Sequence, residues 1–343
     1  MPSPWVPKGA LRRGENCVAM PLLLREADVA RVLKMDDVIH TVEDAFRHLG
    51  QHKAVNRPRQ RSTTATGTVL HVMSAALPPL GAMGLKAYTH ASGAARFLGM
   101  LYSVDTGELL AMMEVDLLGQ LRTGAASAVG TKYLARTDAG SLGVIGTGKQ
   151  ARTQVIAISR VRPIALVKCY SRTAAHREAF ADEMVEELGG EVVAVDSARD
   201  AVDAVDIIVT ATTATEPILL GEWVAPGVHI NAIGSNAATR RELDGEAVVR
   251  SDRIAVDDLE QAHQESGDLI AAVQAGLYSW DRIVELGSIV VGEAAGRTSA
   301  EQITLFESQG IAAEDVATMK LAYDRALQIG VGEQLQKDMT RGA

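Results

Sequence analysis

Short apolar runs recur through the second half of the chain, and most are followed by a stretch of helical periodicity. The runs predict strands near residue 142 and over 165–170, 191–195, 206–211, 228–233 and 253–256, with helices over 151–160, 174–188 and 198–204. Strands that alternate with helices are typical of a parallel sheet covered on both faces. We therefore expect an α/β fold in which this half is a Rossmann-type doubly wound parallel sheet.

The first half has a different pattern. Apolar residues at near-helical spacing predict helix over 23–50, and a polar segment follows at 56–61. Strand-like runs cover 68–75, 82–89, 97–104 and 108–114, with a hairpin turn at 105–107 and short connections that favour antiparallel pairing. Asp116 is expected to cap a helix, rich in small residues, that reaches Leu134. This half therefore reads as a mixed α+β domain.

A glycine-rich turn comes directly after the strand near residue 142. Gly146 permits a tight turn, Gly148 lets the backbone approach a pyrophosphate, and Ala151 keeps the next helix close to the sheet. The amides at the start of that helix can then bind an anion. Close packing of small residues is the alternative reading of this turn. In its context the pattern predicts a dinucleotide site at Gly146, Thr147, Gly148, Lys149, Gln150 and Ala151.

The end of the next strand suggests which dinucleotide binds. An NAD(H) site usually has an acidic residue about 20 to 25 positions after the glycines, whereas this strand ends in Ser171, Arg172 and Thr173. An arginine with flanking hydroxyls can bind a 2′-phosphate through charge-assisted hydrogen bonds. We therefore predict NADP(H) over NAD(H). The alternative is that Arg172 only begins the next helix as a solvated residue.

Further cofactor contacts are expected where two later strands end, because ligands of such sheets bind at the carboxyl ends of the strands. An ordinary polar loop is the alternative for the threonines, and Asp257 and Asp258 at another strand end are expected to cap a helix. The candidate contacts are Thr210, Thr212, Thr213, Ala232, Gly234 and Ser235.

Composition narrows the functional classes. The 343 residues are 47% hydrophobic and 22% charged, which is enough for about two domains, and the net charge of −9 disfavours binding to nucleic acid or an anionic membrane. The two cysteines form no disulfide framework, and His71 and His90 share no ligand spacing with other groups, so we predict no metal. No apolar run approaches a membrane span, and residues 1–19 read as a flexible extension without a signal-peptide core, which favours the cytoplasm.

Three motifs in order carry a resemblance from Met20 onward. They are the run 117–128 (Leu-Leu-Gly-Gln-Leu-Arg-Thr-Gly-Ala-Ala-Ser-Ala), the glycine turn, and the run 226–235 (Pro-Gly-Val-His-Ile-Asn-Ala-Ile-Gly-Ser). Together they resemble the ornithine cyclodeaminase/μ-crystallin family. The resemblance implies a homodimer whose N-terminal sheets pair across the two-fold axis, a nicotinamide cofactor, and chemistry at the Cα of an amino or imino acid.

The resemblance also implies a division of the chain. Residues 20–135 would bind substrate and form the dimer, completed by a C-terminal helix over 312–343, and residues 136–311 would bind the cofactor. The run 303–310 resembles a family motif that leads into this helix. The family's carboxylate-binding arginines fall on Arg59 and Arg122, and its active-site lysine falls on Lys86. An α-carboxylate in an apolar pocket needs forked guanidinium donors, and a lysine near two arginines should have a lowered pKa.

Each of these assignments has an alternative in the sequence itself. Arg57 could take the role given to Arg59. The segment that contains both arginines could also be a solvated loop. Lys86 could be a solvent-facing strand residue, because its neighbours are apolar. Arg122 could simply pair with Asp116 or Glu114.

Two departures from the cyclodeaminases in the family bear on the reaction. Asn236 stands where they carry an aspartate, and an amide cannot act as a general base. Ser171 and Arg172 stand where they carry an acidic residue at the ribose of a tightly bound NAD. Both changes argue against cyclisation of ornithine and favour an oxidoreductase that reduces small, cyclic α-imino acids. His71 stands where the cyclodeaminases carry a glutamate and could contact the substrate, but a histidine in an alternating strand is more often structural. Alternatives are an alanine dehydrogenase acting on pyruvate and ammonia, an ornithine cyclodeaminase, or a μ-crystallin-like NADPH-dependent binding protein.

Overall fold

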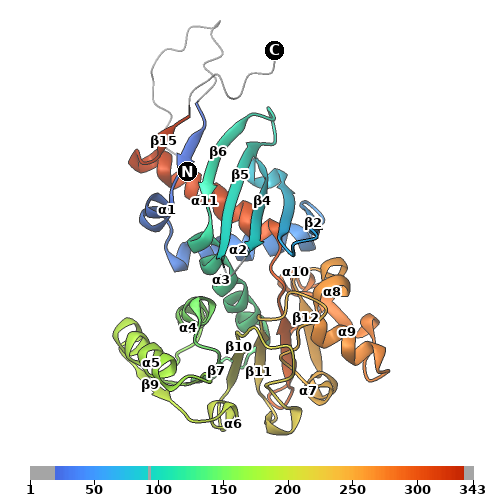
Figure 1. The fold of residues 1–343 in the computed structure, drawn as a ribbon. Helices are drawn as coiled ribbons and strands as arrows, with labels where there is room; N and C mark the ends of the chain where they lie inside the picture. Colours follow the sequence, from blue (N-terminus) through green and yellow to red (C-terminus); the bar gives the residue numbers. More distant parts are fainter. Residues whose placement is uncertain (1–19, 92–93, 336–343) are drawn as a thin grey trace, which may run out of the picture.

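The computed structural model describes residues 20–91 and 94–335, and these form two sheets joined by helices. Figure 1 shows the sheet built from the first part of the chain above the parallel sheet, with the helix of residues 116–134 between them. The expectation of an α/β fold with a Rossmann-type sheet and a mixed N-terminal sheet is confirmed. Residues 1–19, read as a flexible extension, lie outside the described residues.

The N-terminal sheet is mixed. The first strand is parallel to its neighbour near residue 111, and the other pairs are antiparallel. In the described part of the chain the strand order is β15-β1-β6-β5-β4-β3-β2. The strands are β1 (Leu22–Leu24), β2 (Val55–Thr63), β3 (Val69–Leu77), β4 (Ala82–Ala91), β5 (Ala94–Ser103), β6 (Leu109–Glu114) and β15 (Glu333–Gln334).

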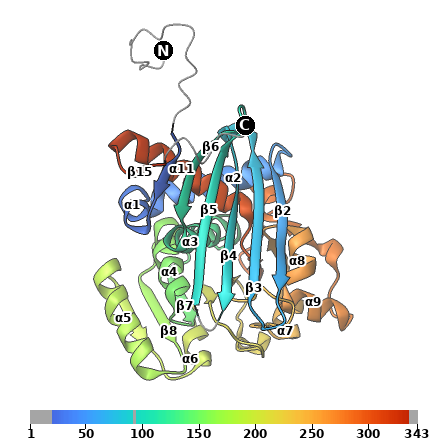
Figure 2. The same cartoon turned by 45° about the horizontal axis from the view of Figure 1, so that its top comes forward.

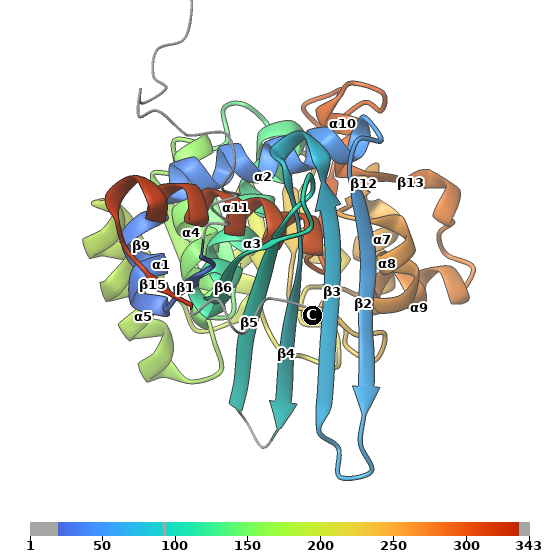
Figure 3. The ribbon, with the colours of Figure 1, turned by 90° about the horizontal axis from the view of Figure 1, so that it is seen from above.

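Helices cover one face of this sheet. Figure 3 shows two of them, α2 and α11, running side by side across it, and both pack on α3. In Figure 2 strands β2 to β5 lie in front of these helices, so their other face is turned away from them. The helices of this part are α1 (Glu26–Val32), α2 (Met35–Gly50), α3 (Asp116–Leu134) and α11 (Ala312–Ile329).

Two expectations for this part were wrong. Residues 23–50 are not continuous helix: they form most of β1, then α1 and α2, and the chain is extended at Leu33 between the two helices. The polar segment 56–61 belongs to edge strand β2, where the register with β3 shifts between Arg57 and Gln60. Pro58 at this shift lacks an N–H, so it suits an edge strand or a bulge. The segment has no alternation of apolar and polar residues, so its sequence did not reveal the strand.

The parallel sheet has the order β13-β12-β14-β11-β10-β7-β8-β9 in the described residues, with β7 between β8 and β10. The strand order reverses there, and ligands of such sheets bind at that point. The strands are β7 (Ser141–Ile145), β8 (Leu166–Tyr170), β9 (Glu191–Ala194), β10 (Ile207–Thr210), β11 (His229–Ala232), β12 (Arg253–Val256), β13 (Ile283–Glu285) and β14 (Thr304–Glu307). The helices are α4 (Lys149–Val161), α5 (Ala174–Leu188), α6 (Ala198–Val202), α7 (Gly245–Arg250), α8 (Leu259–Glu265), α9 (Gly267–Gln274) and α10 (Leu286–Val290).

The run 303–310 is more than a connection into the last helix. Its first part is β14, a buried strand paired with β11 on one side and β12 on the other. Its last residues turn back towards the N-terminal sheet, where α11 packs against β3 and β4. The last helix ends at Ile329 rather than at 343, because Gly330 adopts φ +68° and closes it, and β15 then pairs with β1. Residues 336–343 lie outside the described residues.

Candidate functional site

A cleft of about 390 Å³ lies where the N-terminal sheet and helix α3 meet the carboxyl ends of the parallel strands. A second cleft of about 840 Å³ lies over the glycine turn and the end of β8. Both are lined by Gly148, Ala211, Thr212 and Thr213, so the two clefts adjoin. We call them the substrate cleft and the cofactor cleft. Arg59, Lys86 and Arg122, all predicted as site residues, line the substrate cleft.

Lys86 is a buried residue of β4, and it shares the helix-covered face of the sheet with its register partners Met73 and Gly99. Its Nζ donates to Asp315 Oδ1 at 3.0 Å. Desolvation lowers the pKa of Lys86 to about 8, against the opposing effect of Asp315 and with a further lowering by Arg122. The alternative of a solvent-facing lysine is therefore wrong.

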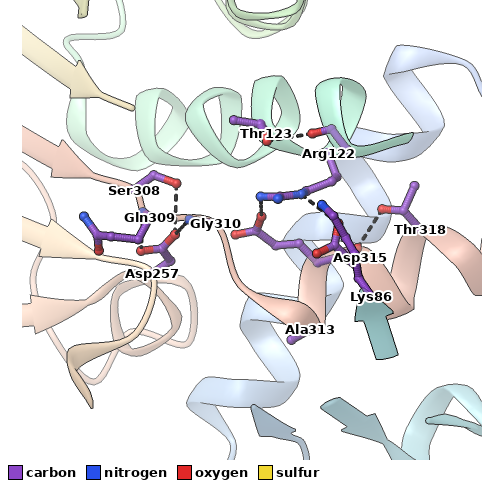
Figure 4. Close-up of polar contacts among 12 residues, drawn as sticks. Lys86, Arg122, Thr123, Asp257, Ser308, Gln309, Gly310, Ala313, Asp315 and Thr318 are labelled. Carbon is purple, nitrogen blue, oxygen red and sulfur yellow. Dashed lines mark hydrogen bonds and ion pairs between the residues drawn. The ribbon is translucent and has the colours of Figure 1, made fainter. Parts of the chain in front are cut away.

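Arg122 points from α3 towards the same carboxylate. Its Nε donates to Asp315 Oδ1 at 3.0 Å and its Nη1 to Glu314 Oε2 at 2.8 Å. Figure 4 shows Lys86 and Arg122 converging on Asp315, which comes from the first turn of α11. Desolvation lowers the pKa of Arg122, but Asp315 and Glu314 outweigh it and raise the pKa above its usual value.

Both alternative partners for Arg122 are engaged elsewhere. Glu114 accepts from the amide of Glu26 at 2.9 Å. Asp116 forms an ion pair with Lys149 at 2.9 Å, across the mouth of the glycine turn. Asp116 also does not cap α3 as expected, because the amides of Asp116 and Leu117 donate to the carboxylate of Glu26. The helix is therefore fixed at its start by a residue some ninety positions earlier, which frees Asp116 to face the cleft.

Arg59 lies at the bulge of β2 and is 5% exposed, whereas Arg57 is exposed. Its Nη1 donates to Glu265 Oε2 at 2.5 Å, and its Nη2 donates to the carbonyls of Gln309 and Gly310 at 2.9 and 3.1 Å. The burial of Arg59 and the exposure of Arg57 distinguish the two candidates and favour Arg59.

The loop that accepts from Arg59 is held by Asp257 at the end of β12. Asp257 accepts from the hydroxyl of Ser308 at 2.9 Å and from the amides of Gln309 and Gly310 at 3.2 and 2.7 Å, as Figure 4 shows. Desolvation raises the pKa of Asp257 to about 6, against these hydrogen bonds. Asp258, but not Asp257, caps a helix as predicted, by accepting from the amide of Gln261.

The acidic partners were missed in the sequence. Glu314 and Asp315 begin a helix whose other early residues are apolar, a pattern that also suits carboxylates stabilised by a helix N-terminus. They are fully buried instead, with 0% and 1% exposure. The signal available in the sequence was this pair of acidic residues on an otherwise apolar helix face, which could have indicated buried partners for the cations. Glu265 ends α8 and gave no such signal, since its partner Arg59 is more than two hundred residues away.

The cofactor cleft fits a dinucleotide. Gly146 has φ +106°, and a Cβ there would lie 2.4 Å from the carbonyl of Ala211, so only glycine is accommodated. A Cβ on Gly148 would meet no atom within 4 Å, which leaves room for a phosphate at the start of α4, where no side chain caps the helix. Gly146 and Thr147 line this cleft, while Lys149 and Gln150 line the substrate cleft.

Ser171, Arg172 and Thr173 also line the cofactor cleft, together with His176, which was not predicted. Arg172 is exposed and forms no ion pair within the described ranges 20–91 and 94–335. Its guanidinium is therefore free to meet an anion in this cleft.

Several predicted cofactor contacts line neither cleft in the described structure. Thr210 donates to the buried carboxylate of Glu242, which also accepts from Thr212 and from the amide of Gly234. Glu242 thus connects the loops after β10 and β11. Of the contacts predicted in these loops, Thr212, Thr213 and Gly234 line the substrate cleft. The predicted residues that instead pack inside the protein are Ala151, Thr210, Ala232 and Ser235.

Asn236 lines the substrate cleft, as predicted, and its carbonyl accepts from Arg61 at 2.8 Å. His71 does not line either cleft. Its ring stacks on Tyr88 with centroids 4.3 Å apart, and desolvation, with Arg61 and Arg59, lowers the pKa of His71 to about 4. It is therefore a neutral packing residue near neutral pH.

Neither a metal-binding cluster nor a membrane-spanning helix occurs in residues 20–91 and 94–335. No three or more His, Cys, Asp or Glu side chains are grouped there so as to hold a metal ion. No helix of this part is both long and apolar enough to cross a membrane.

Known proteins are similar to this chain in sequence and in fold. The model of the ornithine cyclodeaminase/mu-crystallin family matches residues 20–330. A Δ1-pyrroline-2-carboxylate reductase of Bacillus cereus is 35% identical over 325 residues, which is 92% of this chain and 99% of the relative. The structure of the Thermococcus litoralis Δ1-pyrroline-2-carboxylate reductase with NADH and L-proline has a TM-score of 0.88 and 38% identity, covering 92% of this chain and 100% of that one.

An archaeal alanine dehydrogenase, solved as a dimer with bound NAD, has a TM-score of 0.87 and 34% identity over 92% of this chain and 99% of its own. These three relatives are by name reductases or dehydrogenases, the enzyme class expected from the sequence. The family model matches nearly the whole chain, and the site residues that the resemblance implied, Arg59, Lys86 and Arg122, line one cleft. The chain belongs to the ornithine cyclodeaminase/mu-crystallin family.

Proposed function

We propose that this protein is an NADP(H)-dependent reductase that converts small α-imino acids, cyclic ones first, to amino acids. The observation that carries the proposal is the position of Lys86 and Arg122: they share Asp315 in a cleft that Gly148 of the glycine turn also lines. Cations from the first half of the chain thus stand beside the turn that suits a dinucleotide. A concave site with a few convergent polar groups is the usual form of a substrate site.

In this proposal Lys86, Arg122 and Arg59 bind the α-carboxylate of the substrate. Arg122 bonds Glu314 and Asp315 through Nη1 and Nε, which leaves Nη2 available, and Nζ of Lys86 has further hydrogens besides the one given to Asp315. Because internal carboxylates already hold these cations in place, little reorganisation is needed when the substrate binds. The cations then offset the desolvation of the incoming acid.

Lys86 also manages the proton at the substrate nitrogen. When bound, the nicotinamide supplies a hydride to the imine carbon. The ammonium of Lys86 donates a proton to the imine nitrogen, so the C=N bond becomes CH–NH, and the neutral lysine recovers a proton from solvent. A pKa of about 8 suits a group that must both give and regain a proton near neutrality.

The preference for NADP(H) rests on the loop after β8. Arg172 lines the cofactor cleft between two hydroxyl residues, Ser171 and Thr173, and no carboxylate of the described residues lines that part of the cleft to repel a 2′-phosphate. Glu216, the acidic residue that does line the cofactor cleft, follows β10 rather than β8. The solved relatives named above hold NADH or NAD, so the preference distinguishes this chain from them.

We also propose the division of labour expected from the sequence. Residues 20–135 with α11 bind the substrate, and residues 136–311 bind the cofactor. The sheet face turned away from the helices supports a homodimer, because apolar residues pair in register along it, although Ser74 and Glu114 also belong to this face. The apolar residues are Val72, Leu85, Ala87, Leu98, Met100 and Met112. Leu98 is 49% exposed and Leu70 is 41% exposed. Large exposed apolar residues gathered on one face favour an interface with a second copy.

Asn236 argues against cyclisation of ornithine. It lines the cleft beside the cations, where a base for a side-chain amine would be needed, and an amide cannot accept that proton. Pyrroline-2-carboxylate is therefore the first substrate to test. Pyruvate with ammonia comes second, since reductive amination passes through an imine that the same groups could hold.

The test is reduction of pyrroline-2-carboxylate by the purified full chain with NADPH deuterated at C4 of the nicotinamide. We expect NADPH to be consumed and deuterium to appear at Cα of proline. Lys86→Met should lower kcat/KM by roughly a hundred-fold or more, the usual effect of losing a general acid. Tight binding of the imine without NADPH oxidation, on this or any other imine, would contradict the proposal.

Lys320→Met is a matched control. Lys320 also pairs with an aspartate of α11, Asp324, but does not line either cleft. This variant should keep wild-type kcat/KM. Equal losses in both lysine variants would mean that Lys86 acts only through the fold.

A further inference from the structure

One cation of the substrate cleft differs from the rest. Arg240 lines the cleft, and no ion pair joins it to any described residue. Its Nη1 has a single long contact, to Asn236 Oδ1 at 3.4 Å. The other cations of the cleft each pair with a carboxylate: Arg59 with Glu265, Lys86 with Asp315, Arg122 with Glu314 and Asp315, and Lys149 with Asp116.

The backbone at Arg240 is fixed. Its carbonyl accepts from the hydroxyl of Ser235 at 2.8 Å, and its amide donates to the carbonyl of Ala237 at 2.9 Å. A Cβ on Gly267 would lie 1.9 Å from the same carbonyl, so the loop after β11 is packed tightly against the start of α9. The side chain, half-buried, therefore projects from an anchored position rather than from a mobile loop.

Of the two clefts, Arg240 lines the substrate cleft alone. It does not line the cofactor cleft, whose lining includes Ser171 and Arg172. Its neighbour Asn236 accepts, through its carbonyl, from Arg61, and Arg61 shares Glu265 with Arg59. The loop that bears Arg240 thus borders the end of the cleft near β2.

We propose that Arg240 binds a second anionic group of the substrate, so that the preferred substrates are α-imino acids with a carboxylate remote from the imine carbon. This inference rests on the proposed function, since it assigns the substrate class of the same site. The internal carboxylates balance the other cations of the cleft, and a bound α-carboxylate is met by Lys86 and Arg122. A second carboxylate has Arg240 as its remaining partner, and an arginine–carboxylate pair removed from water is among the strong polar contacts.

The experiment compares matched substrates. 2-Oxoglutarate with ammonia and 2-oxovalerate with ammonia give imines of equal chain length with and without the second carboxylate, and pyrroline-2-carboxylate serves as the cyclic reference. NADPH oxidation is measured for the wild type, Arg240→Gln, Arg240→Lys and Arg241→Gln. Arg241 is next in the chain and does not line the cleft.

We expect the wild type to prefer 2-oxoglutarate with ammonia over 2-oxovalerate with ammonia. Arg240→Gln should lower kcat/KM for the dicarboxylate by about ten- to a hundred-fold, the size of one charged hydrogen bond, and leave the other two substrates within about two-fold. Arg240→Lys should restore part of the loss, and Arg241→Gln should resemble the wild type.

Other outcomes separate the two proposals. If pyrroline-2-carboxylate is reduced but Arg240→Gln affects all substrates equally or raises KM for NADPH, Arg240 is a cofactor contact or a structural residue and this inference is wrong. If the wild type reduces pyrroline-2-carboxylate without preferring the dicarboxylate, the inference is wrong and the proposed function stands. If no imine is reduced, the proposed function itself fails.

Discussion

Lys86 and Arg122 donate to the same oxygen of Asp315, although one comes from strand β4 and the other from helix α3. Burial of Asp315 raises its pKa, but Arg122 and Lys86 outweigh this and hold it below the usual value. The carboxylate is therefore ionised at neutral pH. A shared anion keeps two cations in place that would otherwise repel each other across the cleft.

The pKa of Lys86 gives the reaction a pH dependence. Its folded-state pKa is lowered to about 8, so the ammonium that donates the proton is present below that pH and is lost above it. Turnover of pyrroline-2-carboxylate should fall as pH rises through about 8. A pH profile of kcat in the direction of imine reduction measures this.

The variant Asp315→Asn tests whether Lys86 is the group whose titration causes this fall in turnover. Asp315 is the group that raises the pKa of Lys86 against desolvation, so its removal should move the falling limb of the profile to lower pH. A limb that stays at the same pH in the variant would show that another group titrates. Circular dichroism of the variant checks that it remains folded.

Arg172 makes a separate prediction about the cofactor. Arg172→Asp should lower kcat/KM for NADPH by about ten-fold or more, because a charged hydrogen bond to the 2′-phosphate becomes a repulsion, and leave NADH little changed. Arg199→Asp makes the same charge change at an exposed site on α6 that does not line the cofactor cleft. Steady-state kinetics with both cofactors measure the ratio; an unchanged ratio in Arg172→Asp would refute the NADP(H) assignment.

The resemblance to a family identified the cations, but nothing in the sequence identified their partners. Lys86, Arg122 and Arg59 were found through motifs, and alternation along the chain left each with a solvent-exposed alternative. Burial decides between these readings, and burial of Arg59 depends on Glu265 and on the loop at Gln309 and Gly310, which only the tertiary fold brings near. Ion pairs between distant residues have no local signature.

At the level of elements, helix α3 determines how closely the two halves approach. A Cβ on Gly124 would lie 2.4 Å from the carbonyl of Thr153 in α4, and one on Gly130 would lie 2.8 Å from the ring of Phe306 in β14. The small residues of α3 therefore allow close backbone contact, as its composition indicated. This contact also sets the distance between Arg122 on α3 and the glycine turn before α4.

Gly124→Val should destabilise the protein by about 1–3 kcal/mol, the usual cost of overpacking. The helices must separate to accommodate the side chain, so kcat/KM should fall as well. Gly190→Ala is the control, because a Cβ there would have its nearest neighbour at 3.9 Å. Thermal unfolding followed by circular dichroism measures the effect, and equal melting temperatures for the two variants would contradict it.

Strands with strong apolar patterns were predicted well, and those without were not. The runs that became β8, β10, β11 and β12 are mainly apolar, and every residue of β10 and β11 is buried, as expected for strands covered on both faces. Strand β2 was read as a polar segment because its side chains bind partners or face solvent, and β14 was absorbed into a motif. Both strands bring residues to the site. Where the apolar pattern of a segment is weak, its tertiary contacts determine whether it forms a strand.

For the whole molecule, α11 connects the two parts. It follows β14 of the parallel sheet, packs on the N-terminal sheet and supplies Glu314 and Asp315 to cations of the first half. The last part of the chain thus completes a site that begins near residue 59. Family motifs predicted that this helix returns, but they did not predict that it carries the carboxylates of the site.

The open sheet face predicts the oligomeric state. Leu98→Glu places a charge on the outer face of β5, opposite Ala87 of β4, and should dissociate a dimer because a buried carboxylate would lack a partner. Leu277→Glu is the control, since Leu277 is 52% exposed and lies away from the sheet. Analytical ultracentrifugation should give a dimer for the wild type and the control and a monomer for Leu98→Glu; a monomeric wild type would contradict the proposal.

The central claim is that cations of the first half hold an acid against a nicotinamide bound to the second half. A crystal structure of the protein with NADP⁺ and L-proline tests it most directly. We predict that the proline carboxylate lies within hydrogen-bonding distance, about 3 Å, of Lys86 and Arg122, with its Cα facing C4 of the nicotinamide. Proline bound elsewhere, with Lys86 and Arg122 contacting only Asp315 and Glu314, would contradict the account.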